Sequence, residues 1–81
     1  CASPGVVLAP NGILEGKRAT CYPGFEERFP DSAEHLEDRV VIDGNLITSK
    51  GPGTAAQFAV EIIRYLLDGE TADKIAETTL Q

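Results

Sequence analysis

The feature that most constrains this chain lies in residues 45–67, where a β-branched run, a Gly-Pro-Gly turn and a helical apolar pattern follow one another. The run Leu46-Ile47-Thr48 predicts a strand because β-branched and apolar residues favour extended backbone. Asp43-Gly44, just before it, favours a tight hairpin turn back to Val40-Val41-Ile42. The pattern therefore predicts a hairpin that leads through a turn into a helix.

The turn after this strand is predicted to be rigid. Gly51 and Gly53 permit backbone angles that are closed to other residues, and Pro52 fixes φ between them. Thr54 is expected to cap the free amides of the helix that follows.

Apolar residues recur at helical spacing in the next stretch and predict a face that packs on a sheet. They are Phe58, Ala59, Ile62, Ile63, Leu66 and Leu67. Glu61 and Arg64 lie off this face, three residues apart, and are expected to pair at the surface. Asp68-Gly69 predicts the end of the helix. Residues 70–77 predict a short second helix with Thr71 as its cap.

The chain begins with Cys1, and residues 1–9 are predicted to become helical because proline, here Pro4, is tolerated in a first turn. A thiol at the start of a helix faces the positive end of its dipole, which stabilises a thiolate. Cys1 is therefore a candidate nucleophile. From the thiol alone, an incidental cysteine at the first position explains the pattern better.

Residues 17–21 predict a short strand, and Tyr22-Pro23-Gly24 predicts a turn. Cys21 thus lies at the end of a strand, where binding residues collect in open α/β sheets. A buried structural thiol is the simpler interpretation, because free cysteine usually behaves as a small hydrophobic residue.

Residues 25–38 are rich in acids and are interrupted by Pro30, which predicts a surface loop with one turn of helix. Paired carboxylates can serve acid–base chemistry, but a solvated acidic face is far more common. His35, the single histidine, is expected to be a solvated surface imidazole rather than a catalytic base.

Composition sets outer limits on the function. The 81 residues allow one small domain, and the net charge of −6, from 13 acidic and 7 basic residues, argues against nucleic acid or an anionic membrane as partner. No segment has the length or apolar character of a membrane span, so a cytoplasmic protein is expected.

The two cysteines form neither a disulfide framework nor a metal-ligand motif, and we expect no metal and no cofactor. The chain contains no Met, so we expect it to be part of something longer.

Several segments together resemble one family, the ThiJ/PfpI superfamily. They are Cys1-Ala2-Ser3-Pro4, Glu37-Asp38-Arg39-Val40, the block from Asp43 through Thr54, and Phe58-Ala59. The block Thr48-Ser49-Lys50-Gly51-Pro52-Gly53-Thr54 before a Phe-Ala helix is highly specific, whereas the cysteine segment alone would be weak. The resemblance covers essentially all 81 residues.

The resemblance implies a flavodoxin-like three-layer α/β sandwich, similar to class I glutamine amidotransferases, with residues 1–81 as the C-terminal half of a single domain. It implies that Cys1 is the catalytic thiol and that the Ala2 amide forms part of an oxyanion hole. Cys21, Gly51 and Pro52 would line the pocket. A glutamate and a glycine pair of the family belong to the N-terminal half, which is therefore an expected partner.

Two departures from the family pattern bear on the chemistry. The peptidase branch carries His directly after the cysteine, and this chain has Ala2. Some deglycase-like members carry a pocket His near the position of Cys21 and Tyr22, and this chain has none there. Proteolysis is therefore disfavoured, and the general acid or base remains unassigned.

The leading hypothesis is a cysteine-dependent deglycase or glyoxalase, in which the Cys1 thiolate adds to the aldehyde carbon of a small dicarbonyl such as methylglyoxal. The alternative is a stress protein, either a redox sensor or a holdase chaperone, whose cysteine is oxidised to sulfinate. We expect a small aldehyde substrate, a homodimer, and neither nucleic acid nor membrane as partner.

Overall fold

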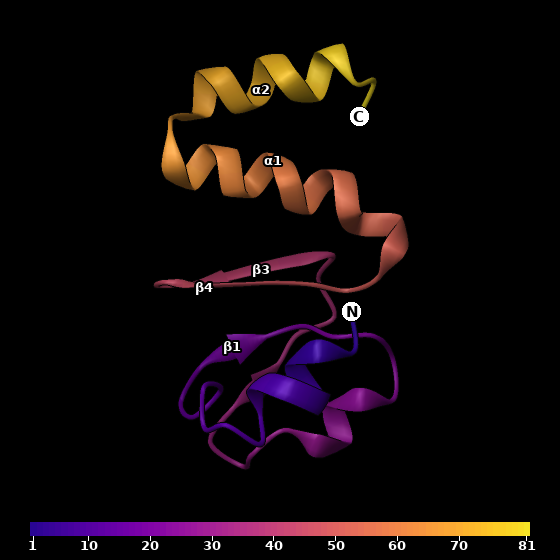
Figure 1. The fold of residues 1–81 in the computed structure, drawn as a ribbon, viewed down its shortest axis with the longest axis vertical. Coiled ribbons are helices and arrows are strands. Elements are labelled where there is room, and N and C mark those ends of the chain that lie inside the picture. The colour runs from indigo at the N-terminus through magenta and orange to yellow at the C-terminus, as the bar shows by residue number, and fades with distance from the viewer.

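The computed structural model describes all 81 residues and has a mixed α/β architecture, with extents of 38 × 22 × 17 Å. In chain order the elements are η1 (Pro4–Leu8), β1 (Arg18–Ala19), η2 (Phe25–Arg28), β2 (Glu34–His35), β3 (Val40–Asp43), β4 (Leu46–Ser49), η3 (Pro52–Thr54), α1 (Ala55–Leu66) and α2 (Gly69–Thr78). The N-terminal segment forms a compact unit at one end, followed by the β3–β4 hairpin, α1 and α2 (Figure 1). None of the helices is both long and apolar enough to cross a membrane.

The predicted hairpin is confirmed. Strands β3 and β4 pair antiparallel, with Asp43 opposite Leu46, so that only Gly44 and Asn45 form the turn. Gly44 has φ of 61°, in the left-handed region that such two-residue turns require. The Asp-Gly signal therefore located this turn correctly.

The short strand predicted in residues 17–21 is present as β1, but its partner was not predicted. Strand β2 lies within residues 25–38, which the sequence assigned to a loop with a turn of helix, and it pairs parallel to β1 with Ala19 opposite His35. The turn of helix is present as η2. A two-residue strand carries no readable periodicity, so only the pairing with β1 defines β2.

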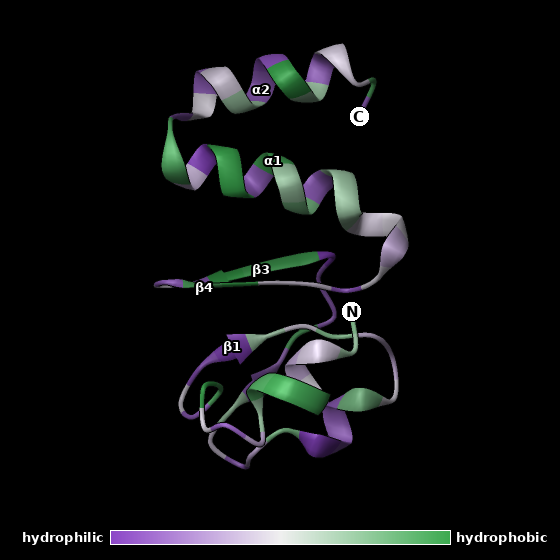
Figure 2. Ribbon diagram, in the orientation of Figure 1, coloured by the Kyte–Doolittle hydropathy of each residue, from purple (hydrophilic) through white to green (hydrophobic).

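Helix α1 lies between the hairpin and α2 (Figure 1), and its apolar residues colour it green in Figure 2, whereas α2 is more polar. Its one fully buried side chain is Val60, which the predicted face did not include. Leu66 and Leu67, which that face did include, are 69% and 68% exposed. The helix is about 18 Å long and the paired strands only about 13 Å, so the hairpin is too short to cover the end of the helix.

Both predicted helix caps are corrected by the structure. The Thr54 side chain makes no capping bond to α1, and its hydroxyl instead donates to the Gly51 carbonyl at 2.9 Å. The cap of α2 is Asp68 rather than Thr71, since an Asp68 carboxylate oxygen accepts from the Thr71 N–H at 2.6 Å. The predicted Glu61–Arg64 pair is present at 3.3 Å.

The Gly-Pro-Gly turn does not depend on left-handed backbone. Gly51 is fully extended, with φ of −176°, and Gly53 is not among the residues with positive φ. The prediction that these two glycines adopt angles closed to other residues is therefore wrong. A Cβ at Gly51 would lie 3.4 Å from the Tyr22 ring, at the lower edge of ordinary van der Waals contact.

Two hydrogen bonds join the N-terminal unit to the end of β4. The Cys1 amino group donates to the Ser49 carbonyl at 2.8 Å, and the buried Thr20 N–H donates to the Thr48 hydroxyl at 3.0 Å. Within the N-terminal unit, the Tyr22 N–H donates to the Cys1 carbonyl at 2.7 Å. Cys1 is thereby held between Tyr22, which follows β1, and Ser49, which ends β4 just before the Gly-Pro-Gly turn.

Candidate functional site

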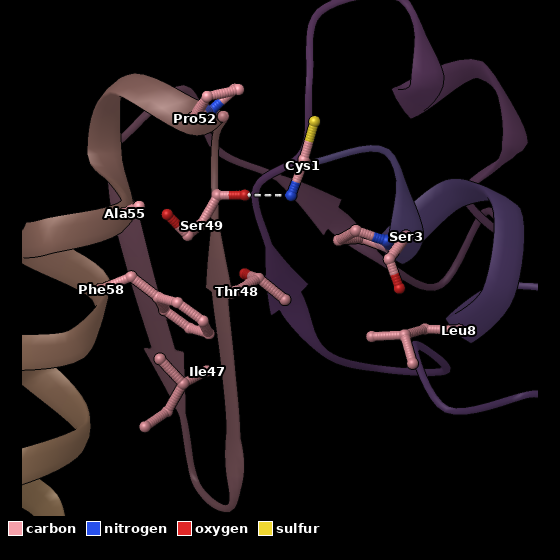
Figure 3. Close-up of a pocket in the computed structure, with 11 residues that line it drawn as sticks. Cys1, Ser3, Leu8, Ile47, Thr48, Ser49, Pro52, Ala55 and Phe58 are labelled. Carbon is pink, nitrogen blue, oxygen red and sulfur yellow. Dashed lines mark hydrogen bonds between the residues drawn. The ribbon is translucent and has the colours of Figure 1, made fainter.

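The larger pocket of the molecule, with a volume of about 410 Å³, opens between the N-terminal unit and the β4–α1 connection (Figure 3). Its lining residues are Cys1, Ser3, Pro4, Leu8, Ile47, Thr48, Ser49, Gly51, Pro52, Ala55 and Phe58. These include no carboxylate, imidazole or amine side chain. The pocket therefore offers one reactive side chain, the thiol of Cys1, in apolar surroundings.

Cys1 is solvent-exposed, and its backbone is fixed on both sides. Its amino nitrogen donates to Ser49 and its carbonyl accepts from Tyr22. The next residue, Ala2, starts the helical segment, since its carbonyl accepts from Gly5 and Val6 at 3.1 and 3.0 Å. The Ala2 N–H donates to no group of the chain, so it is free to bind an anionic oxygen next to the thiol.

The opposite wall of the pocket is held by a buried hydroxyl network. Thr54 and Ser49, which are 6% and 8% exposed, share a short hydrogen bond between their hydroxyls. The Gly51 N–H also donates to the Thr54 hydroxyl, at 3.2 Å. Thr54 thus ties the turn that carries Pro52 to the end of β4, beside Cys1.

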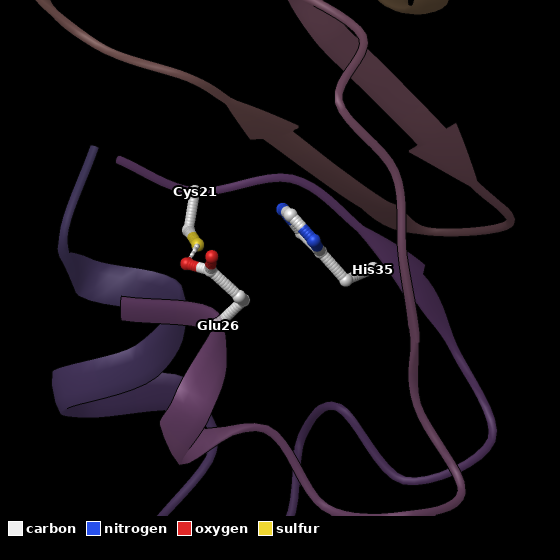
Figure 4. A group of neighbouring side chains, drawn as sticks. All are labelled: Cys21, Glu26 and His35. Carbon is white, nitrogen blue, oxygen red and sulfur yellow. Dashed lines mark hydrogen bonds between the residues drawn. The ribbon is translucent and has the colours of Figure 1, made fainter. Parts of the chain in front are cut away.

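A second, smaller pocket of about 40 Å³ lies at the carboxyl ends of the parallel strands β1 and β2. It is lined by Cys21, Pro23, Glu26, His35, Glu37 and Lys50. The sulfur, carboxylate and imidazole of Cys21, Glu26 and His35 all lie within 4.8 Å of one another (Figure 4). Sulfur, nitrogen and oxygen donors, the three kinds that bind borderline metal ions such as Zn²⁺, therefore lie together in this pocket.

The ionisation of this second pocket is set by burial and by backbone amides. Burial raises the pKa of the Cys21 thiol, and the negative charge of Glu26 raises it further. Hydrogen bonding to the Glu26 and Gly24 amides lowers the pKa of the Glu26 carboxyl. The Gly24 N–H donates to that carboxylate at 2.7 Å, and Gly24 has φ of 98°. Glu26 is therefore an ionised group in a fixed position.

The site residues predicted from the sequence lie at two different pockets in the structure. Cys1, Gly51 and Pro52 line the larger pocket together, and Ala2 lies directly beside it on the chain. Cys21 is buried, 1% exposed, and lines the smaller pocket instead.

Sequence reasoning missed Glu26 and His35 as neighbours of Cys21. The expectation of a solvated surface histidine is wrong, since His35 is half-buried and packs edge-on against Phe29, with ring centroids 5.7 Å apart. The spacing of residues 21, 26 and 35 matches no ligand motif, so only the β1–β2 pairing could have brought them together.

In a comparison with known protein families, residues 1–65 match the model of the DJ-1/PfpI family. The chain is 45% identical over 80 residues to Protein DJ-1 homolog A of Arabidopsis thaliana, covering 99% of this chain and 20% of that protein. It is 40% identical over 76 residues to the glutathione-independent glyoxalase DJR-1.2 of Caenorhabditis elegans, covering 93% of this chain and 40% of that protein.

Among solved structures, oxidized Toxoplasma gondii DJ-1 superposes with a TM-score of 0.90 at 42% identity, covering 99% of this chain and 43% of that one. The chain thus spans between 20% and 43% of the length of these relatives. The fold is part of a flavodoxin-like α/β sandwich, as the resemblance implied. The family model, the relatives and the superposition agree, and the chain belongs to the DJ-1/PfpI family.

Proposed function

We propose that this chain carries the nucleophile of a cysteine-dependent enzyme that acts on small reactive dicarbonyls, such as methylglyoxal, or on their protein adducts. The Cys1 thiolate adds to the aldehyde carbon. Its lone pair forms the C–S bond, and the carbonyl π electrons move to the oxygen. The resulting oxyanion is bound by the free Ala2 N–H.

The observation that carries this proposal is the position of Cys1. The thiol is exposed at the mouth of a pocket of about 410 Å³, next to an unused backbone amide. This volume suits a small molecule, and the apolar walls at Ile47 and Phe58 suit the methyl end of a ketoaldehyde. The similarity to a glyoxalase is a further support.

The proposal requires proton transfer groups that the pocket lining lacks. No acid or base is among the lining residues, and His35 lies in the other pocket. We propose that these groups come from outside residues 1–81, on a complementary half of the same domain. Support comes from the exposed apolar side chains of Leu66 and Leu67 and from the greater length of the relatives.

The test measures consumption of methylglyoxal, and formation of the corresponding 2-hydroxy acid, by the intact protein. Cys1→Ser is expected to lower kcat/KM by at least about a hundredfold, because serine is a poor nucleophile without a base. Cys21→Ser is the matched control and is expected to retain activity. Equal loss in both variants, or none in either, would overturn the assignment of Cys1.

A second candidate is an oxidisable sensor or holdase, favoured by the exposure of Cys1 in a pocket without an acid or base. In that case, peroxide oxidises the Cys1 thiol to the sulfinate, which adds two oxygens. The same protein then shows no turnover of methylglyoxal. Intact-mass measurement during peroxide titration, run beside the turnover assay, separates the two candidates.

A further inference from the structure

The smaller pocket contains a cluster whose donor atoms converge from three elements. Cys21 follows β1, His35 ends β2, and Glu26 lies in the first turn of η2. Because β1 and β2 are parallel, their carboxyl ends meet at the same edge, and binding residues collect at such edges. Figure 4 shows the thiol, the carboxylate and the imidazole turned toward one another.

We propose that Cys21, Glu26 and His35 form a zinc-binding site, with the fourth coordination position open to the adjoining cavity. Zn²⁺ accepts thiolate sulfur, imidazole nitrogen and carboxylate oxygen in one tetrahedral site, whereas the harder Mg²⁺ and Ca²⁺ avoid sulfur. Three protein ligands and one open position are typical of zinc sites that keep a bound water.

The distances are compatible with closure around a metal ion. The Cys21 sulfur lies 4.0 Å from a Glu26 oxygen, and no pair of donor atoms exceeds 4.8 Å. Neighbouring donors in tetrahedral zinc sites are about 3.4 to 3.6 Å apart, so the three atoms must approach by roughly 1 Å or less. Rotation about side-chain torsions provides movements of this size, and the three donor atoms already lie within 4.8 Å of one another.

Two of the three ligands are held in place without a metal. The Gly24 N–H fixes the Glu26 carboxylate at 2.7 Å, and burial fixes Cys21. His35 is positioned by the backbone pairing of β2, with the Leu36 N–H donating to Ala19 at 2.9 Å. Such support for ligands is a usual property of metal sites.

Space and charge at the site suit a hydrated cation. The cavity of about 40 Å³ exceeds the roughly 10–15 Å³ that one water needs. Glu37 and Lys50 also line the cavity, and the Lys50 ammonium donates to the Glu37 carbonyl at 3.3 Å. With Glu26 and Glu37 against a single ammonium, the charged side chains leave a net negative pocket.

The test titrates metal-free intact protein with Zn²⁺ alone, against a chromophoric chelator. All variants are made in a Cys1→Ser background, which removes the exposed thiol as a competing ligand. One zinc ion per chain is expected, and Co²⁺ in its place is expected to give a sulfur-to-metal charge-transfer band. Cys21→Ser removes that band.

His35→Gln and Glu26→Gln are each expected to weaken zinc binding by at least about tenfold. Glu27→Gln is the matched control, because Glu27 has the same charge on the same turn but is exposed and outside the pocket, and binding should be unchanged. If Cys21→Ser fails to fold by circular dichroism, the His35→Gln result decides. The absence of stoichiometric zinc binding, or binding that His35→Gln and Glu26→Gln leave unchanged, would overturn the site.

Discussion

Cys1 and Cys21 belong to adjacent segments, joined by the hydrogen bond from the Tyr22 N–H to the Cys1 carbonyl, yet their surroundings differ in every respect. Cys1 is exposed in an apolar pocket of about 410 Å³ that contains no acid or base. Cys21 is buried beside a carboxylate and an imidazole, with about 40 Å³ of free space. One pocket has room for a substrate, and the other has room for an ion.

This difference is the basis for proposing nucleophilic chemistry at Cys1 and metal-ligand chemistry at Cys21. A thiol that attacks a carbonyl needs access and a place for the developing oxyanion, both of which lie at Cys1. A thiol that binds a metal needs other donors at fixed distances, which lie around Cys21.

The largest effect is expected in alkylation. In the intact protein, iodoacetamide should modify Cys1 faster than Cys21, on the order of a hundredfold, because Cys21 is buried and burial raises the pKa of its thiol. Peptide mass mapping over time measures both rates. Preferential labelling of Cys21 would reverse the assignment of the nucleophile.

The second prediction concerns the stability of the contact between η1, which follows Cys1, and η2, which carries Glu26. Gly5 lies in η1 behind Cys1, and a Cβ there would be 2.5 Å from the Phe25 carbonyl in η2, beside Glu26. Gly5→Ala should lower the free energy of unfolding by about 1–3 kcal/mol. Gly53→Ala, with no atom within 4 Å of the new Cβ and no positive φ, should leave it unchanged or slightly raise it. Urea denaturation tests both, and similar midpoints for the two variants would contradict this packing.

A third change is aimed at the wall of the Cys1 pocket alone. Thr54→Val removes the hydroxyl that holds Gly51 and Ser49 and should cost about 1 kcal/mol or somewhat more, because buried partners lose a hydrogen bond. Methylglyoxal consumption should fall and zinc binding at Cys21 should not. Thr54→Ser retains the hydroxyl and should restore both stability and activity, and a loss of zinc binding in Thr54→Val would show that the pockets are coupled.

The smallest effect is expected outside both pockets, at the cap of α2. The Thr71 N–H lowers the pKa of Asp68, so this cap stabilises the fold fully above the ordinary aspartate pKa. That contribution is lost as the pH falls through the lowered value. Asp68→Asn keeps a cap without the charge and should flatten this part of the acid unfolding curve. Melting temperatures from neutral to acidic pH measure it, and reactivity at Cys1 and Cys21 should stay unchanged.

The sequence by itself determined those features that depend on neighbouring residues. Asp43-Gly44 fixed the hairpin because the turn needs positive φ at Gly44, and helical spacing fixed α1 and the Glu61–Arg64 pair. The family blocks also brought Cys1 together with Gly51 and Pro52. For the hairpin, α1 and the ion pair, the physical signal lies within a few residues of the feature that it predicts, whereas the grouping of Cys1 with Gly51 and Pro52 came from the family resemblance.

Only the tertiary structure decided which side chains are covered and which distant ones meet. Leu66 and Leu67 follow the helical pattern but extend past the short hairpin, so their exposure depends on the length of another element. His35 joined Cys21 and Glu26 through a two-residue parallel strand pair that has no pattern of its own. Periodicity predicts which face of a helix or strand is apolar, but not which other element packs against it. Both pockets of this chain are formed between segments that are far apart in the sequence.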